Sequence, residues 1–444
     1  MARAKKGTAL TPEERLQAAL VPDWEWPYKL PENWCWTRHN SIMDIVGGAQ
    51  PEKAFFIREP KEGYVQLYQT RDYGENPVPV YIPQKYATKT TDEGDILLAR
   101  YGGSLGKVFR AHKGAYNVAL AKVIILYPEV VDDEFLYLYY YSHFYQDFCI
   151  KAGYGRSAQA GFNKSDLNEL LFPLPPFIEQ RRIVDRIESL FAKLDEAKEK
   201  AQAVVDSFET RKAAILHKAF TGELSAKWRE EHGVSIDNWK TTRFDSVAAI
   251  RSNLVDPAEY QSFPHIAPDN IEKKTGVLLE YHTIAEDGVT SGKHRFYSGQ
   301  ILYSKIRPYL SKVVVVDFDG LCSADMYPIE AYQNARCLWY YMLSDEFLLQ
   351  ASTAGSRSVL PKINQKELSA LTVHLPTNDR EQEEIARILD ELFDKEQQTK
   401  EAAEIVLDQI ELMKKSILAR AFRGELGTND PNEESAVELL KQII

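Results

Sequence analysis

The sequence predicts an α+β fold in which two mixed α/β domains are separated by two long helices that form an antiparallel coiled coil. Three observations predict it. The 444-residue chain contains one long unit twice, each copy begins with short β-rich segments, and each copy ends in a helical stretch with a regular apolar stripe. A duplicated unit of this kind implies a pseudo-two-fold internal repeat.

The repeat consists of identical residues that return in the same order at a spacing of 201–205 positions. Examples along the unit are Asn33-Trp34 with Asn238-Trp239, Gly94 with Gly299, Lys107 with Lys312, Asn163 with Asn364, Glu179-Gln180 with Glu381-Gln382, and Gly222-Glu223-Leu224 with Gly424-Glu425-Leu426. Chance matches would not stay collinear over the whole unit, so we infer an internal duplication.

The duplication and the composition divide the chain into six segments. They are an N-terminal extension with a short helix (1–29), a first mixed domain (30–176), a central helix (177–222), a linker with a second mixed domain (223–377), a distal helix (378–426) and an acidic C-terminal tail or helix (427–444). In the extension, Thr11 and Glu14 form a capping-box pattern that predicts a helix over Pro12–Leu20, for packing or for subunit docking. The tail is either a docking helix or a frayed end.

Short β-rich runs broken by glycine and proline predict the sheets of the two mixed domains. They are Asp95–Ala99, Lys122–Leu126, Gln300–Ser304 and Lys312–Val316. An aromatic stretch in each copy, Glu134–Cys149 and Ala335–Gln350, is typical of a helix.

The two long helices are predicted from apolar residues that alternate at +4 and +3. The first stripe is Ile183, Ile187, Leu190, Leu194, Ala197, Ala201, Val204, Phe208, Arg211 and Ile215, and the second is Ile385, Leu389, Leu392, Glu396, Thr399, Ala403, Val406, Ile410, Met413 and Ile417. Only Arg211 interrupts the first stripe, and Glu396 and Thr399 interrupt the second. Such a repeat is a coiled-coil seam, which one helix cannot bury alone.

The expected partner of each helix is the equivalent helix of the other copy, packed antiparallel, although a parallel coiled coil between two chains fits the same pattern. The span from Ile183 to Ile215 is about 48 Å at about 1.5 Å per residue, or about 14 base pairs of duplex DNA. If the partner is DNA, the helices therefore have the length to separate the two mixed domains by a turn or more of the duplex.

The net charge of −11 alone speaks against a nucleic-acid partner. The segment from Asp379 to Ile444, however, holds 17 acidic and 9 basic residues, so most of the excess negative charge lies there. The rest of the chain is close to neutral, which keeps nucleic acid open as a partner.

Positive charge gathers at the same place in both copies, in Arg100–Tyr127 and Gly292–Val316, which contain no acidic residue. With the interleaved tyrosines, these runs predict contacts to DNA phosphates and base edges. The candidates are Arg100, Tyr101, Ser104, Lys107 and Arg110 in the first copy, and Lys305, Arg307, Tyr309 and Lys312 in the second. A solvated strand face is the alternative.

A second candidate surface is a loop rich in Gly, Ser, Gln, Asn and Arg, found at Ala152–Asp166 and Ala354–Glu367. Arg binds guanine in two places, and Asn or Gln binds adenine in the same manner. The candidates are Arg156, Gln159, Asn163 and Lys164, with Arg357, Ser358, Lys362 and Asn364 in the second copy. An ordinary surface turn is the alternative.

The helix segments resemble a known family. FPLPPFIEQRRIVDRIESLFAKLDEA followed by RKAAILHKAFTGEL is similar to the central repeat of type I restriction-modification specificity subunits. HLPTNDREQEEIARILDELFDK with KKSILARAFRGEL is a more degraded second copy, and GDILLAR resembles the target recognition domains of that family. The resemblance extends from about Leu30 to Leu426.

The resemblance implies that each mixed domain is a target recognition domain that reads half of a bipartite, asymmetric double-stranded DNA site. It implies that the helices set the spacer and bind two methyltransferase (modification) subunits, and that restriction subunits join them. S-adenosylmethionine would then bind the modification subunits, and ATP and Mg²⁺ the restriction subunits. No cofactor is expected on this chain.

The sequence shows no signature of an enzyme. It lacks an Asn/Asp-Pro-Pro-aromatic motif, a Walker A P-loop and HExxH, so no catalytic residue is predicted. Its 4 cysteines are far apart, which predicts neither a zinc site nor disulfides, and no secretory signal is evident, so a cytoplasmic protein is expected. A coiled-coil adaptor that binds only proteins is the alternative function.

Overall fold

The computed structural model describes residues 11–154, 161–355 and 361–443. The chain forms two compact units: unit 1 is Met1–Glu199 with Val406–Ile444, and unit 2 is Lys200–Ile405. Each unit therefore takes its mixed domain from one copy of the repeat and helical segments from both copies.

The strands of the first mixed domain form the sheets of unit 1. A four-stranded antiparallel sheet has the order β2 (Met43–Gly47), β9 (Leu120–Ile125), β6 (Ile96–Ala99) and β7 (Val108–Arg110). A second has the order β4 (Tyr81–Pro83), β3 (Tyr64–Tyr68), β8 (Gly114–Tyr116) and β5 (Thr90–Thr91). A third joins β1 (Cys35–Arg38) to β10 (Leu171–Leu174).

Unit 2 repeats this plan. Its four-stranded sheet has the order β12 (Ala248–Ile250), β20 (Met326–Ala331), β17 (Ile301–Ser304) and β18 (Val313–Val315). A five-stranded sheet has the order β13 (Leu254–Val255), β16 (Lys293–Phe296), β19 (Gly320–Cys322), β14 (Pro264–Ile266) and β15 (His282–Thr283), and β11 (Trp239–Arg243) pairs with β21 (Thr372–Pro376). The matching strand order of the four-stranded sheets confirms the internal repeat.

The helices cover these sheets and connect them. They are α1 (Pro12–Ala19), α2 (His39–Ile42), α3 (Asp133–Tyr139), α4 (His143–Tyr154), α5 (Phe177–Asp206), α6 (Phe208–Phe220), α7 (Ala226–His232), α8 (Ile284–Asp287), α9 (Ala335–Met342), α10 (Asp345–Ala354), α11 (Gln365–Ala370), α12 (Asp379–Ala421) and α13 (Ala436–Ile443). The capping box predicted for α1 is confirmed: the Thr11 hydroxyl accepts from the Glu14 amide at 3.2 Å, and the Glu14 carboxylate accepts from the Thr11 amide at 2.8 Å. None of the described helices combines the length and apolarity that a bilayer crossing requires.

The aromatic stretches differ from the single helix expected in each copy, because each forms two helices with a serine between them. Ser142 precedes α4, and Ser344 is the N-cap of α10, where its hydroxyl accepts from the Phe347 amide. Serine suits a helix start better than a helix interior, since its side chain satisfies the first free amides.

The first long helix is also broken, whereas the second is continuous. α5 ends at Asp206 and α6 begins at Phe208, while α12 runs unbroken from Asp379 to Ala421. At the break, the Ser207 hydroxyl donates to the Ala203 carbonyl at 2.6 Å. Such a bond competes with the helix backbone and bends or interrupts it.

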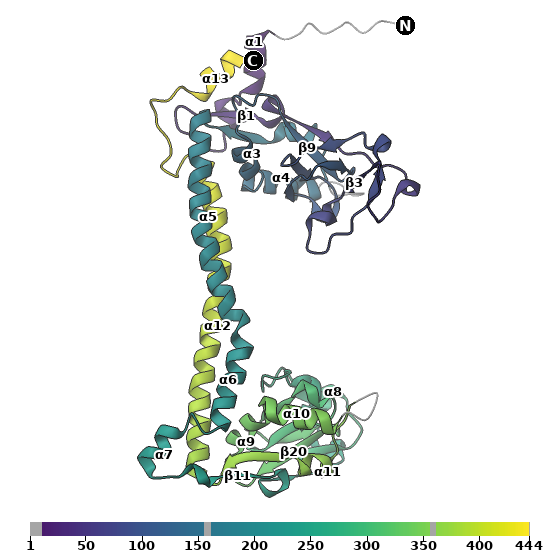
Figure 1. Cartoon of the computed structure of the whole chain (residues 1–444), viewed down its shortest axis with the longest axis vertical. Helices are drawn as coiled ribbons and strands as arrows, with labels where there is room; N and C mark the ends of the chain where they lie inside the picture. Colours follow the sequence, from purple (N-terminus) through teal and green to yellow (C-terminus); the bar gives the residue numbers. More distant parts are fainter. Residues whose placement is uncertain (1–10, 155–160, 356–360, 444) are drawn as a thin grey trace. The chain divides into compact units, whose positions relative to one another are not determined.

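The long helices pack antiparallel, as predicted, because residue numbers rise along one helix as they fall along the other. In unit 1, Asp195 of α5 pairs with Lys414 of α12, and Lys198 pairs with Glu411. Figure 1 shows the α5 ribbon beside α12. In unit 2, the Lys400 ammonium lies 4.9 Å from the centre of the Phe208 ring. The partner of each helix is thus within the same chain, and the parallel two-chain alternative is not adopted.

The polar interruptions of the two stripes meet in unit 2. Arg211 Nε donates to Glu396 Oε2 at 2.7 Å. The positive charge that interrupts the first apolar stripe is thus neutralised by the negative charge that interrupts the second. Their counterparts in unit 1 by the repeat are Leu194 and Met413, which are apolar. A paired charge at a seam position fixes the register of the two helices.

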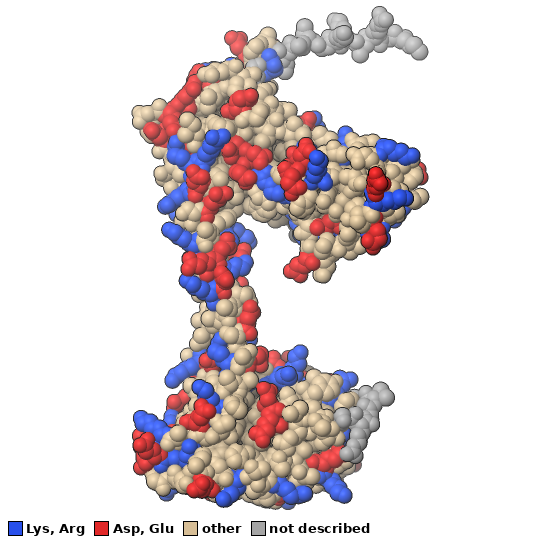
Figure 2. Space-filling view, in the orientation of Figure 1, with Lys and Arg blue, Asp and Glu red and all other residues tan. Residues whose placement is uncertain are grey.

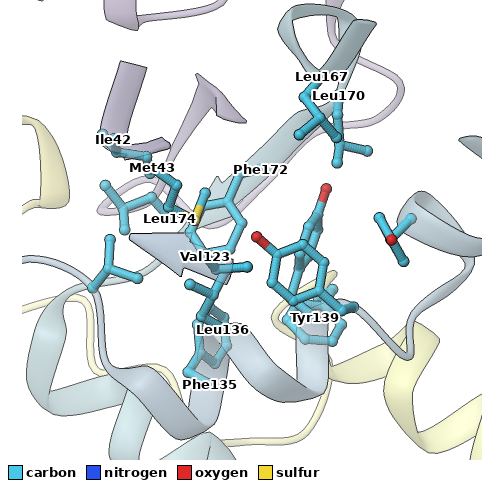
Figure 3. Close-up of a cluster of buried hydrophobic side chains, with 14 of the residues drawn as sticks. Ile42, Met43, Val123, Phe135, Leu136, Tyr139, Leu167, Leu170, Phe172 and Leu174 are labelled. Carbon is cyan, nitrogen blue, oxygen red and sulfur yellow. The ribbon is translucent and has the colours of Figure 1, made fainter. Parts of the chain in front are cut away.

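Aromatic side chains fill the core of each mixed domain where it meets the helices. In unit 1 the Tyr139 ring lies 4.8 Å from Phe172 and 5.6 Å from Phe422, and Figure 3 shows Tyr139 among the surrounding apolar side chains. In unit 2 the Tyr341 ring lies 5.0 Å from Phe220 at the equivalent position. The 4 cysteines are buried, which raises the pKa of the Cys35 and Cys149 thiols to about 12.

A buried glutamate at the start of α5 fastens the helix to the domain of unit 1. Glu179 is 0% exposed, and its carboxylate accepts from Trp34 Nε1 at 2.8 Å, Asn429 Nδ2 at 2.9 Å and the Thr428 hydroxyl at 3.2 Å. Burial raises the pKa of Glu179, which these bonds and Arg182 only partly oppose. The donors after Phe422 tie the C-terminal segment to unit 1.

The equivalent glutamate of unit 2 has a cationic partner instead. Glu381 is also 0% exposed and accepts from Trp239 Nε1 at 2.9 Å and from the Ser225 hydroxyl at 2.8 Å. Arg229 of α7, whose side chain is 11% exposed, forms an ion pair with it at 2.8 Å. The carboxylate of the Trp34–Glu179 pair is therefore hydrogen-bonded by neutral donors, whereas the carboxylate of the Trp239–Glu381 pair also has a cationic partner.

The C-terminal tail is ordered on unit 1. Ala436 and Leu440 of α13 are buried in the same core as Ala19 and Trp34, and the Ala436 amide donates to the Asn33 carbonyl at 3.0 Å. Arg182 of α5 also binds Glu433 through two bonds of 2.7 Å. Of the two expectations for the tail, docking within its own chain is the one observed.

Candidate nucleic-acid interface

The structure joins the two surfaces that the sequence predicted separately in the first copy. The segment after β6 forms a bridge between Tyr101 and Gly161, and the Phe162 amide donates to the Arg100 carbonyl at 3.2 Å. The Tyr101 hydroxyl donates to Asn163 Oδ1 at 3.2 Å. Residues 100–107 and 161–164 therefore form one surface, the interface of unit 1.

The same connection occurs in unit 2. Ile306 forms a bridge with Lys362, and the Ile363 amide donates to the Lys305 carbonyl at 2.9 Å. The Arg307 amide donates to the Pro361 carbonyl at 2.7 Å. Residues 305–312 and 361–364 are the interface of unit 2. The bridge and the amide-to-carbonyl hydrogen bond that join its two segments are equivalent to those in the interface of unit 1.

Arg100 is held in a fixed orientation in the interface of unit 1. Its Nε donates to the Val118 carbonyl at 3.1 Å, and its guanidinium lies 4.7 Å from the centre of the Tyr101 ring. Gly47 lies beside it, and a Cβ there would lie 2.8 Å from Arg100 Nη2, so a larger residue at this position would require the guanidinium to shift. A planar guanidinium held in this way suits bidentate recognition of a base or phosphate.

The other candidates of unit 1 differ in their surroundings. Lys107 is exposed, Ser104 is half-buried at the end of a 3₁₀ turn, and Lys164 is exposed but pairs with Asp44 at 2.6 Å. Arg110 is bound by Asp133 and Glu134, with the latter at 2.7 Å, so its charge is compensated. A DNA contact from Arg110 stays a prediction that would require it to leave these carboxylates.

Lysines and a carboxylate form a cluster in the interface of unit 2. Asp325 Oδ1 lies 3.1 Å from Lys362 Nζ and 4.0 Å from Lys305 Nζ, and Lys305 lies 5.2 Å from the centre of the Tyr327 ring. Burial lowers the pKa of Lys305, and the charge of Lys362 lowers it further. A carboxylate placed so can accept a hydrogen bond from a cytosine amino group.

Arg307 has an unusual backbone. It adopts φ +49° and ψ +59°, a left-handed conformation that a residue with a side chain rarely takes. Its counterpart by the repeat is Gly102, with φ +69°. Arg307 and the following Tyr309 are exposed, so an arginine stands on the surface where glycine would be less strained, which is typical of functional positions.

Two candidates of unit 2 have local structural partners. Lys312 is mostly buried, and its ammonium donates to the Pro268 carbonyl at 2.7 Å. Asn364 is the N-cap of α11, and its side chain accepts from the Glu367 amide at 2.9 Å. The remaining candidates, Arg156, Gln159, Arg357 and Ser358, lie outside the described residues.

Sequence reasoning missed Asp325, because the search selected positive and amide side chains. The sequence repeat gave no signal, because the alignment with Ala119 comes from the structure: the Lys305 amide donates to the Asp325 carbonyl just as the Arg100 amide donates to the Ala119 carbonyl. Lysine and arginine lie among aspartate and glutamate over both units on the face shown in Figure 2, and the coloured residues form no broad surface of one sign there.

The family model described as "Type I restriction modification DNA specificity domain" matches residues 31–205 and 236–406. The specificity subunit of the type I restriction enzyme EcoDI from Escherichia coli is 36% identical over 381 residues, covering 79% of this chain and 84% of that protein. The specificity subunit of EcoKI from Escherichia coli strain K12 is 24% identical over 467 residues, covering 94% of this chain and 96% of that protein. The HsdS subunit from Thermoanaerobacter tengcongensis has the same fold, with a TM-score of 0.59 at 18% identity over 90% of this chain and 99% of that chain.

Proposed function

This chain belongs to the family of type I restriction-modification specificity subunits, and from that membership we propose that unit 1 and unit 2 each read one half of a bipartite, asymmetric site in double-stranded DNA. DNA sequence specificity is the function of the family. The adaptor alternative, which binds only proteins, is not favoured by this membership.

The observation that carries the proposal is the duplicated interface. In each unit, the segment that follows a buried strand of the four-stranded sheet is bonded to the later part of the polar loop, residues 161–164 in unit 1 and 361–364 in unit 2. The backbone bonds are the same, but the exposed side chains differ between the units. Two equivalent platforms with different side chains fit two different half-site sequences.

The paired helices would set the unread spacer and bind two methyltransferase (modification) subunits, which restriction subunits would join. The length of α12, 43 residues, corresponds to about 65 Å at about 1.5 Å per residue, enough to accompany a turn or more of DNA. Catalysis would belong to the partners: S-adenosylmethionine to the modification subunits, and ATP and Mg²⁺ to the restriction subunits. The chain would act in the cytoplasm.

Mapping of methylated bases across the genome, in cells with and without the gene, tests this proposal. We expect a single motif with two specified halves and a fixed gap that disappears with the gene. A motif with one continuous specified block, or no dependence on the gene, would contradict it. Inserting helical residues into both α5 and α12 should change the gap and leave both halves unaltered.

A further inference from the structure

A groove in unit 1 borders the interface of unit 1 and shares Lys107 with it. Its volume is about 770 Å³. It lies between the segment that follows β6, the helix α3 and the last turns of α12, and its lining includes Gly106, Tyr137, Tyr141, Phe191, Lys414 and Leu418. The Tyr141 side chain is 43% exposed, so an aromatic ring is available at this surface.

The equivalent groove of unit 2 is partly filled by the chain itself. By the repeat, Tyr137 corresponds to Trp339 and Lys414 corresponds to Lys212. The turn Lys274–Gly276 lies against these residues, and the remaining cavity is about 390 Å³. The structure of unit 2 therefore shows which chemistry fits a groove of this shape.

Hydrogen bonds to backbone atoms hold the turn in unit 2. The Lys212 ammonium donates to the carbonyls of Lys274 and Thr275, both at 3.2 Å. The Lys274 amide donates to the Leu310 carbonyl at 3.1 Å. These hydrogen bonds are made to backbone atoms of the turn, so they do not depend on its side chains.

Glycine is required at the tip of the turn. Gly276 adopts φ +79°, and a Cβ there would lie 2.4 Å from Trp339 and 3.1 Å from Leu343. The glycine Cα therefore packs directly on the apolar floor. The counterpart of Leu343 in unit 1 is Tyr141, whose aromatic ring offers an apolar face at the same position of the repeat.

The charges of the groove favour an acidic occupant. In unit 2, Lys312 lies 3.5 Å from Asp269 of the same segment. Its counterpart Lys107 is exposed at the rim of the open groove, and Lys415, also exposed, replaces Ala213. Glu411 also lines the groove, where it pairs with Lys198, and the rim carries Lys107 and Lys415, for which unit 2 has Lys312 and Ala213.

We propose that the open groove of unit 1 binds a glycine-tipped, acidic turn of a second polypeptide, in the way that unit 2 binds its own Lys274–Gly276 turn. The glycine packs on Tyr137 and Tyr141, and its preceding carbonyls accept from Lys414, which leaves Asp195. Acidic side chains beside the turn pair with Lys107 and Lys415. This site shares Lys107 with the interface of unit 1, but the proposal does not require that DNA is read there.

The chain supplies its own probe for the test. A fluorescein-labelled peptide of residues Pro268–Leu279 with Lys273→Glu and Lys274→Glu, which makes the turn acidic, is titrated with the full chain, and fluorescence anisotropy reports binding. We expect saturable binding that Tyr141→Ala and, separately, Lys415→Glu weaken by about tenfold, since each removes one contact worth about 1.4 kcal/mol. The same peptide with Gly276→Val should not bind.

The control is Tyr332→Ala, which removes a tyrosine that is 59% exposed on unit 2 and should leave binding unchanged. Circular dichroism confirms that each variant is folded, and Lys415→Glu alters only an exposed side chain. Equal binding by Tyr141→Ala and Tyr332→Ala, or binding of the Gly276→Val peptide, would overturn the proposal. Displacement of the peptide by a DNA duplex would assign the groove to nucleic acid and also overturn it.

Discussion

Unit 1 and unit 2 build their interfaces with the same backbone bonds but present different side chains there. Arg100 and Lys305 occupy one equivalent position, and Ala119 and Asp325 occupy another. The backbone bonds depend on strand and loop geometry, whereas the side chains at the surface do not contribute to the core. The comparison teaches that this repeat separates the residues that maintain the platform from those that determine what it binds.

The buried glutamates give the same comparison in the interior. Glu179 of unit 1 is bound by neutral donors, and Glu381 of unit 2 is bound by Arg229 as well. Loss of a buried charge leaves its partner without compensation, which costs more than loss of a neutral hydrogen bond. The two units should therefore differ in their response to the same substitution.

The largest expected effect is that of Glu381→Gln. It leaves Arg229 buried without a carboxylate, so we expect the free energy of unfolding of unit 2 to fall by about 3 kcal/mol. The matched change Glu179→Gln should cost unit 1 about 1 kcal/mol, because its donors are neutral. Urea unfolding measures both, and equal losses would contradict the assigned difference.

The next effect concerns the interfaces. Asp325→Ala should alter base discrimination at one position of the half-site read by unit 2 by about 2 kcal/mol, or about thirtyfold. Ala119→Asp should alter only the other half-site. Methylation of a plasmid library with both half-sites randomised measures this. A uniform rise in methylation without a changed preference would mean that Asp325 acts only by its charge.

A smaller effect on stability is expected at Arg307 and Gly102, the two equivalent positions with left-handed backbone. Arg307→Gly should raise the free energy of unfolding by about 1 kcal/mol by relieving backbone strain, and should weaken DNA binding. Gly102→Ala should instead destabilise unit 1 by about 1 kcal/mol. Thermal unfolding and DNA titration are compared on the same samples. Unchanged DNA affinity in Arg307→Gly would remove Arg307 from the interface.

The smallest effect is on pH dependence. Because burial raises the pKa of Glu179 in the folded state, its contribution to stability is full below its unfolded pKa of about 4.3 and is lost as the pH rises through the folded value. Unit 1 should therefore lose stability relative to Glu179→Gln as the pH rises from about 4 toward neutrality. Urea midpoints across this range measure it, and parallel profiles would contradict it.

Periodicity predicted most of the fold. The repeat, the antiparallel helices and the α1 capping box follow from spacings along the sequence, which the structure confirms. The breaks at Ser207 and Ser344 were not predicted, because a serine hydroxyl can face solvent or bind the backbone, and spacing does not decide between them.

The candidate interface was predicted in part. The sequence located both segments of each copy, but the bond between Tyr101 and Asn163 joins positions too far apart for any local pattern to connect them. Lys312 and Asn364 matched the composition of a binding surface, yet they bind Pro268 and cap α11. Composition reports which groups can bind a ligand and not which groups already have a partner.

The division of the chain between the units has a consequence for synthesis. Unit 2 is one continuous segment, whereas Phe422 and the donors to Glu179 reach unit 1 only after unit 2 has been translated. At roughly 5–20 residues per second, that delay is about 10–40 s. Unit 2 can fold first on the ribosome. Meanwhile the core around Tyr139 lacks Phe422 and stays accessible to chaperones until that segment has been translated.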